Sequence, residues 1–372
     1  MLRAVPLITL AALCFAPSPL AAQRAVTATF PAAGMLRRGW IDTNRPAWGR
    51  LGPRPLATTV WYPADTPDIP DTLTMGPPGQ PLFVAGVVAR NASFANHAAH
   101  PLILLSHGTG GSALQLAWLG IALARRGYVV AAVDHHGNTA AEPAYDPRGF
   151  TLWWERAIDL SVVLDLLLAD STIGPRVDRN RIGAAGFSIG GYTVLALAGG
   201  RTRLVEFDAF CASAERDATC GAQAEMPDAL NQMDLLMQSD SAVQRSMAHA
   251  GDQYRDDRIR AVVTLAPAVM RAVPAASLRS IVVPMLIIAG DSDEIAPALT
   301  NARHVAGLVP HARFRLFRAV GHYTFLSSCT ARGRTILPDL CHDAPGVDRD
   351  AIHTRAAALI ADFFDATLAL PR

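Results

Sequence analysis

The amino-acid sequence predicts an α/β fold, with a mostly parallel central sheet covered by helices on both faces. Three observations support this prediction. Short apolar runs alternate with helical stretches over most of the chain. A Gly-x-Ser-x-Gly pentapeptide, residues 186–190, lies where one apolar run gives way to a helical one. A glycine-rich segment, residues 107–111, follows an earlier apolar run.

The alternation begins near residue 100. Residues 24–100 are rich in Pro, Gly and Asn and contain only short β-like pieces such as residues 58–62. Beyond them, short continuous apolar runs are typical of strands buried in a parallel sheet. We expect strands at 102–105, 128–133, 181–187, 261–265, 285–289 and 313–317, and helices at 112–126, 153–170, 301–308 and 351–368.

One region departs from this rhythm. Residues 201–258 show no strand pattern but contain an amphipathic stretch over 228–249. Since they lie between a predicted helix and the next predicted strand, we interpret them as a helical insertion, a cap or lid over the site.

The composition is that of an ordinary globular protein, with a formal net charge of +1 and 17% charged residues over 372 positions. The chain has no basic stripe and no acidic tail, so nothing favours nucleic acid as a partner. It is long enough for one large core with an insertion. We therefore expect one domain over 23–372, and the sequence does not predict its oligomeric state.

The first residues read as a targeting segment. Arg3 supplies a positive charge, residues 7–15 an apolar stretch, and residues 20–22 a small-residue cleavage site before Gln23. Prolines interrupt the uncharged segment, which disfavours a stable membrane anchor; they are Pro6, Pro17 and Pro19. We interpret residues 1–22 as a signal peptide and expect an exported protein, periplasmic or secreted.

Cysteine usage agrees with export. Four cysteines remain beyond the signal, as two sequence-local pairs, and short loop closure favours Cys211–Cys220 with Cys329–Cys341. Four free thiols are the alternative. No Cys or His spacing suggests zinc, and we expect neither a metal nor an organic cofactor.

Ser188, at the centre of the pentapeptide, has the setting of a nucleophile. A strand precedes it and a helix follows it, and small residues two positions away on each side allow the chain to turn sharply. The start of the following helix then offers unpaired backbone N–H groups to any negative charge that develops beside the serine.

A serine nucleophile needs a base and an acid. His322 follows the predicted strand 313–317 on a loop that would reach back to Ser188, and we assign it as the base. The acid should follow the preceding strand. There Asp293 fits best; Asp291 is the alternative as acid or as a turn former, and Glu294 is expected to face solvent.

An oxyanion hole needs two converging backbone N–H groups. The residue after the nucleophile, Ile189, supplies one. The glycine-rich loop supplies the other, and we expect Thr109 to donate it. The chain order of serine, acid and histidine is that of α/β-hydrolases and differs from the orders of the chymotrypsin and subtilisin groups.

These motifs resemble the α/β-hydrolase superfamily, and more narrowly the predicted dienelactone-hydrolase group related to platelet-activating-factor acetylhydrolases. The likeness covers about residues 55–200 and 258–365, and a serine stands where dienelactone hydrolases proper have a cysteine. It implies that Ser188, Asp293 and His322 form the triad and that Thr109 and Ile189 form the hole. The motifs that carry it are Val60-Trp61-Tyr62-Pro63-Ala64, Ser106-His107-Gly108, residues 133–139, residues 186–192 and Gly321-His322-Tyr323-Thr324-Phe325.

The substrate is less constrained by the sequence. Trp153 and Trp154 follow a strand-end loop, where they would line an acyl pocket or belong to the core, and His135 lies on that loop within reach of substrate. We expect a serine hydrolase that cleaves small carboxylic esters of short or medium acyl length through an acyl-enzyme. The alternatives are an exported lipase, polyester hydrolase or peptidase with a lid, and a non-catalytic binding protein on the same scaffold.

Overall fold

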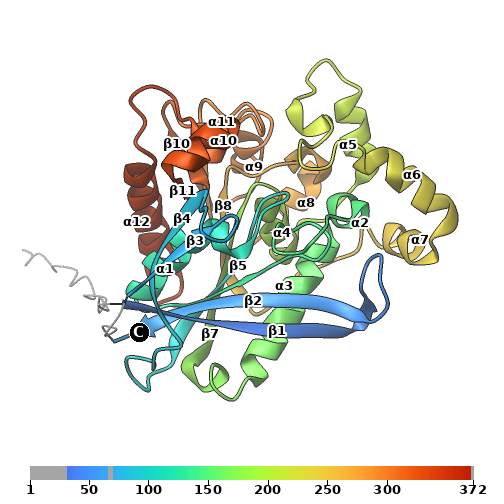
Figure 1. Cartoon of the computed structure of the whole chain (residues 1–372). Helices are drawn as coiled ribbons and strands as arrows, with labels where there is room; N and C mark the ends of the chain where they lie inside the picture. The colour runs from blue at the N-terminus through green and yellow to red at the C-terminus, as the bar shows by residue number, and fades with distance from the viewer. Residues whose placement is uncertain (1–31, 66–69, 370–372) are drawn as a thin grey trace, which may run out of the picture.

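The computed structural model describes residues 32–65 and 70–369, so the predicted signal peptide lies outside the described residues. Within those ranges eleven strands form one sheet in the order β10-β9-β8-β7-β5-β6-β2-β1-β4-β11, with β3 beside β4 (Figure 1). The strands are β1 Ala32–Pro46, β2 Pro53–Ala64, β3 Asp71–Met75, β4 Phe83–Arg90, β5 His100–Ser106, β6 Val129–Val133, β7 Val177–Phe187, β8 Ile259–Leu265, β9 Met285–Gly290, β10 Ala312–Phe317 and β11 Ser328–Cys329.

The strands from β5 to β10 build the parallel part of the sheet. β5 pairs in parallel with β6 and β7, and β7, β8, β9 and β10 continue in parallel beyond it. Every strand and helix expected after residue 100 is present, with ends shifted by a few residues. The predicted α/β class is therefore confirmed. The carboxyl ends of these parallel strands share one edge, which is where ligands bind in such sheets.

Helices cover both faces of the sheet, and the strands alternate to match. In β5, Leu102 and Leu104 face the core layer beneath α3 and α4, while Ile103 and Leu105 face the layer beneath α1 and α12. Figure 1 shows α1 and α12 together on one side and α3 on the other. The helices are α1 Ala117–Arg125, α2 Pro147–Thr151, α3 Glu155–Ala169, α4 Ile189–Leu197, α5 Leu204–Cys211, α6 Ala229–Ser239, α7 Ser241–Ala248, α8 Ala275–Arg279, α9 Ala302–Ala306, α10 Ala331–Ile336, α11 Pro338–Cys341 and α12 Arg349–Thr367, with 3₁₀ turns η1 Ala113–Leu116, η2 Gly174–Arg176, η3 Ala218–Cys220, η4 Met270–Ala272 and η5 His322–Phe325.

The amino-terminal part contains more strand than the short pieces expected. β1 and β2 form a long antiparallel ribbon that joins the parallel part through antiparallel pairing of β2 with β6. Charged and small residues interrupt the apolar pattern of β1, since most of its outer half, residues 37–46, is exposed or partly exposed. Pairing to β2 fixes that half as a strand, and a single-sequence pattern does not reveal such pairing.

The predicted insertion is helical and holds α5, η3, α6 and α7. The amphipathic stretch is two helices, because the side chain of Asp240 caps the start of α7. Met233 of α6 and Val243 of α7 pack with Trp48 and Trp154 in a separate small core. These two helices therefore rest on the side of the domain, and the turn around η3 is the part of the insertion that borders the cavity described below.

Both predicted disulfides are present. Cys211 is bonded to Cys220, and Cys329 is bonded to Cys341. No helix within the described ranges is long and apolar enough to cross a membrane.

Candidate active site

Ser188 lies on a sharp turn between β7 and α4. Its φ of 56° is in the left-handed region that residues with side chains rarely adopt, a conformation that costs roughly 1–3 kcal/mol. A side chain at Gly186 would come within 2.0 Å of the carbonyl oxygen of Gly190, and one at Gly190 within 2.1 Å of the carbonyl oxygen of Ser106. Both glycines are thus required for the turn, and the turn lifts the Ser188 hydroxyl above the strand ends.

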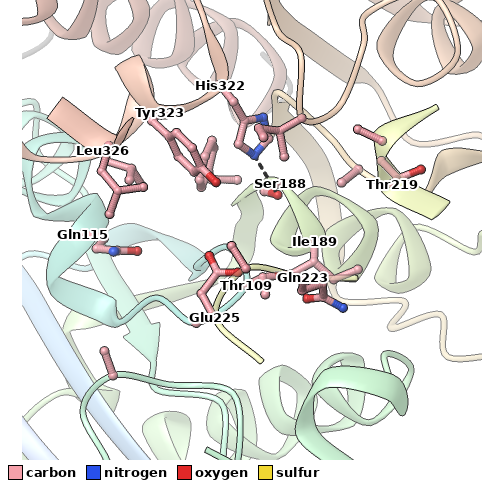
Figure 2. Close-up of a pocket in the computed structure, with 18 of the residues that line it drawn as sticks. Thr109, Gln115, Ser188, Ile189, Thr219, Gln223, Glu225, His322, Tyr323 and Leu326 are labelled. Atoms are coloured by element: carbon pink, nitrogen blue, oxygen red, sulfur yellow. Dashed lines mark hydrogen bonds between the residues drawn. The ribbon is translucent and has the colours of Figure 1, made fainter. Parts of the chain in front are cut away.

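The other two predicted residues converge on this serine. His322, in η5 after β10, has its Nε2 3.0 Å from the Ser188 Oγ (Figure 2). Its Nδ1 lies 2.8 Å from Asp293 Oδ2, on the loop after β9. Because a carboxylate only accepts, Nδ1–H donates to Asp293 and leaves Nε2 free to accept the serine proton. This is the arrangement that activates a serine hydroxyl.

Asp293 and Asp291 have different surroundings. The Asp293 side chain is fully buried, and its second oxygen accepts from the N–H groups of Ile295 and Ala296 at 3.0 and 2.7 Å. Asp291 is exposed and accepts from the N–H of Ala319 at 2.6 Å. Asp291 therefore fixes a turn, and Asp293 is the carboxylate at the histidine.

The glycine-rich loop after β5 approaches the nucleophile closely. A side chain at Gly108 would come within 2.9 Å of the Phe187 ring and 3.2 Å of the Ser188 Cβ. The N–H of Gly110 donates to Asn138 Oδ1 at 2.6 Å, which fixes the loop. Thr109 and Ile189 both line the cavity beside Ser188, and Ile189 begins α4, where N–H groups have no partner within the helix.

A cavity of about 450 Å³ opens above Ser188. Apolar and aromatic side chains form most of its wall, with a smaller number of polar groups among them, as in small-molecule sites. Among the residues drawn in Figure 2 are Thr109, Gln115, Gln223, Glu225, Tyr323 and Leu326. Burial, and then the nearby carboxylates, raise the pKa of Tyr323 to about 12, so this hydroxyl stays protonated near neutral pH.

Of the three residues predicted to contact substrate, only one lines the cavity. Trp153 lines the cavity. Trp154 does not: its ring is buried in the small core beside α6 and α7, and its Nε1 donates to Ser246 Oγ at 2.9 Å. His135 does not reach the cavity either, because it is fully buried beneath the glycine-rich loop. The expectations for Trp154 and His135 are corrected accordingly.

His135 belongs instead to a second series of serine, histidine and aspartate. Its Nε2 lies 2.9 Å from Ser106 Oγ and its Nδ1 2.9 Å from Asp159 Oδ2. Burial, then the charge of Arg156, hold the pKa of His135 well below its usual range, so the ring is neutral. All three side chains are buried away from any substrate, so this series is structural.

This buried series supports the glycine-rich loop. The N–H of His135 donates to His107 Nε2 at 3.0 Å, and Arg156 donates to the carbonyl oxygen of His107. Although burial raises it, Arg54 and Arg45 hold the pKa of Asp159 well below its usual range. Asp159 and Arg156 were not predicted from the sequence, since both lie within a helix pattern that gives no sign of an inward-facing charge.

No group of three or more His, Cys, Asp or Glu side chains in the described part of the chain is arranged to hold a metal ion.

The parallel sheet, the strained serine turn after β7 and the histidine after β10 together make up the α/β-hydrolase fold, the fold that the sequence predicted. Residues 86–215 match the model of the PET hydrolase-like family. The chain is 35% identical over 104 residues to the cutinases est1 and est2 of Thermobifida alba, a match that covers 27% of this chain and 31% of each relative. The matched region thus spans about a third of the curated relatives.

Among solved structures, the chain is similar to a ferulic acid esterase from Streptomyces cinnamoneus. The TM-score is 0.58 at 21% sequence identity, and the alignment covers 92% of this chain and 93% of that one. This similarity extends over nearly the whole chain and supports the same fold.

Proposed function

We propose that the protein is a serine hydrolase that cleaves carboxylic esters of short or medium acyl length. One observation carries the proposal: Asp293, His322 and Ser188 are linked by hydrogen bonds at the floor of a largely apolar cavity. The similarity to cutinases supports the bond type. The family match includes Ser188, Thr109 and Ile189 but not Asp293 or His322, whose proposed roles rest on geometry.

The first half of the reaction forms an acyl-enzyme. Ser188 Oγ attacks the carbonyl carbon of the ester while His322 Nε2 takes the hydroxyl proton. The carbonyl oxygen becomes an oxyanion, which the backbone N–H groups of Thr109 and Ile189 would stabilise. The intermediate then collapses, the bond to the alcohol oxygen breaks, and His322 gives its proton to the departing alcohol.

The second half releases the acid. His322 takes a proton from water, the resulting hydroxide attacks the acyl carbon, and the bond to Ser188 Oγ breaks as the proton returns to the serine. Throughout, the buried carboxylate of Asp293 orients the ring and stabilises its charged form.

Hydrolysis of p-nitrophenyl butyrate by purified protein tests this function. We expect Ser188→Ala to lower kcat by at least about 10³-fold, since removal of a serine nucleophile leaves only binding and oxyanion stabilisation. A fluorophosphonate should label the wild type and not the variant. Equal turnover in the two proteins would contradict the proposal.

A polymeric ester is a second candidate substrate, favoured by the match to the PET hydrolase-like model. Release of soluble acid from a polyester film, compared with hydrolysis of the small ester, would decide between them. We also propose that the chain is exported to the periplasm or the medium, because disulfides persist in oxidising compartments. An amino-terminal sequence beginning at Gln23 in the mature protein would support this.

A further inference from the structure

The cavity above Ser188 is electrostatically one-sided. Glu225 is the only carboxylate among the described residues that line it, and no arginine lines it. The proposed ester hydrolysis does not use this side chain. His322 is the one lining residue of the described chain that can carry a positive charge, so the Glu225 carboxylate, held in a largely apolar cavity, strongly influences which substrate groups can enter.

The chain immediately before the segment that carries Glu225, residues 221–226, is anchored. The Cys211–Cys220 disulfide closes the loop immediately before it. Asp217 accepts hydrogen bonds from Asn301 Nδ2 at 2.9 Å and from Thr300 Oγ1, which attaches this part of the insertion to the loop after Asp293. These contacts position the start of the segment, whose residues form one wall of the cavity.

Glu225 points inward from this wall. Its stem packs over Gly110, where a side chain would come within 2.6 Å of the Glu225 Cγ. Figure 2 shows its carboxylate turned into the cavity beside Thr109. Burial raises the pKa of Glu225, and the Glu225 charge contributes, after burial, to the raised pKa of Tyr145. The Glu225 charge therefore acts on at least one other group that lines the cavity, the neighbouring Tyr145 hydroxyl.

Glu225 and Gln223, the polar side chains of the segment, both carry oxygens that can accept a hydrogen bond. Within the described chain no other residue donates a hydrogen bond to the Glu225 carboxylate, which receives one from its own backbone N–H. The Oε1 of Gln223 is buried and has no hydrogen-bond partner among the described residues. Buried acceptors are nearly always satisfied in folded proteins, so the unpartnered Gln223 oxygen indicates a ligand that donates, and the Glu225 carboxylate in the same wall can accept from that ligand as well.

We propose that residues 221–226 form a subsite for a hydrogen-bond-donating group of the ester substrate, a hydroxyl or a protonated amine, with Glu225 as the specificity-determining residue and Gln223 as the second acceptor. The inference rests on the proposed ester hydrolysis and names its substrate class. The same carboxylate repels esters that carry a second, ionised carboxyl group.

Four methyl esters of closely similar length test the subsite: 6-hydroxyhexanoate, 6-aminohexanoate, heptanoate and the monoester of adipic acid. Their distal groups are a neutral donor, a cationic donor, a methyl group and an anion. A parallel set of butyrate esters with 2-hydroxyethyl, 2-(dimethylamino)ethyl and 3-methylbutyl alcohols places the donor on the other side of the ester bond. The measured quantity is kcat/KM at pH 7.5.

We expect the wild type to prefer the donor esters of at least one set over the apolar ester by about tenfold or more, and the adipate to be the poorest substrate. Glu225→Gln keeps the shape but removes the charge, so it should lower the preference for the amine and raise the rate with adipate. Glu225→Leu should lower the preference for both donors, and Gln223→Leu should lower the hydroxyl preference. Glu206→Gln, an exposed substitution of the same charge on the same insertion, should leave every ratio unchanged.

The outcomes are distinguishable. Equal kcat/KM for donor and apolar esters in the wild type would overturn the subsite while ester hydrolysis stands. So would a Glu225→Gln variant whose kcat/KM ratio of the 6-aminohexanoate to the heptanoate ester equals that of the wild type. Absence of hydrolysis for every ester together with absence of fluorophosphonate labelling would reject the proposed function, and the subsite with it. Thermal unfolding of each variant confirms that altered ratios come from folded protein.

Discussion

At Ser188, contacts of neighbouring backbone groups determine the conformation of the main chain. The residue keeps an unfavourable φ of 56° because the surrounding chain leaves no alternative: the N–H of Ser188 donates to Leu265, and its carbonyl oxygen accepts from Gly191 and Ala268. The close backbone approaches at Gly186 and Gly190 are part of the same constraint. The nucleophile is thus positioned by main-chain packing before any side chain contributes.

Gly190→Ala tests this constraint. The new methyl group would overlap the carbonyl oxygen of Ser106, so β5 and α4 would have to separate. We expect a loss of about 2 kcal/mol or more in the free energy of unfolding, together with loss of esterase activity. Gly39→Ala is the matched control, because nothing lies within 4 Å of a side chain there. Equal stability of the two variants in urea would contradict the account.

The two aspartates after β9 give a second residue-level prediction. Asp293→Asn should keep the fold but offer an amide where His322 Nδ1–H needs an acceptor, and kcat should fall by about 10³–10⁴-fold. Asp291→Asn should change kcat by less than about tenfold, since Asp291 contacts only a turn. The reverse order of effects would make Asp291 the functional acid.

At the scale of elements, the site was predictable because parallel strands align their carboxyl ends. A serine after β7, an acid after β9 and a histidine after β10 must meet at one edge, and spacing along the sequence is enough to see it. The direction in which a particular side chain points was harder to predict from the sequence. Trp153 and Trp154 lie in the turn before α3, where their side chains point to different places, and the sequence did not say which one would face the cavity.

His135 and Glu225 escaped prediction for related reasons. His135 follows a strand end like a functional residue, but the ion pairs around Asp159 draw it into the core, and those partners are far apart in sequence. Glu225 lies in a region without periodic pattern, and its position depends on a disulfide and on the contacts of Asp217. Long-range contacts of this kind leave no local sequence signal.

Helix α12 supports the turn that carries His322. His353 of α12 donates through Nε2 to the carbonyl oxygen of Thr324 at 2.8 Å and stacks on Trp118. Burial lowers its pKa from 6.5 to about 4. Its folded pKa lies below the unfolded one, so protonation favours unfolding. The contribution of neutral His353 to the free energy of unfolding is therefore complete above pH 6.5 and is lost as the pH falls toward 4.

This linkage predicts a pH dependence of the free energy of unfolding. Between pH 7.5 and 4, His353 alone should account for a decrease of about 3 kcal/mol. His353→Gln retains a donor for Thr324 but cannot titrate, so its stability should change less over this range. The exposed His249→Gln is the control. The prediction fails if urea denaturation gives the same pH slope for wild type and His353→Gln.

On the scale of the whole molecule, two short covalent loops border one cavity. The segment closed by Cys211 and Cys220 contributes Ala218 and Thr219 to the lining, and the segment closed by Cys329 and Cys341 contributes Leu337 and Leu340. Both segments are irregular chain or short helical turns with little core of their own. Their place at the cavity therefore depends on the crosslinks more than on burial.

Removal of each crosslink should thus affect stability and substrate binding together. The bonds join residues separated by 9 and 12 positions, and loops of this size restrict the unfolded chain by roughly 3 kcal/mol each. The double variants Cys211→Ala/Cys220→Ala and Cys329→Ala/Cys341→Ala should each lose about that much in urea denaturation. Both should raise KM for p-nitrophenyl butyrate more than they lower kcat, because the cavity wall loosens while Ser188 and His322 keep their own supports. A fall in kcat at constant KM would instead mean that the crosslinked segments hold the catalytic groups themselves.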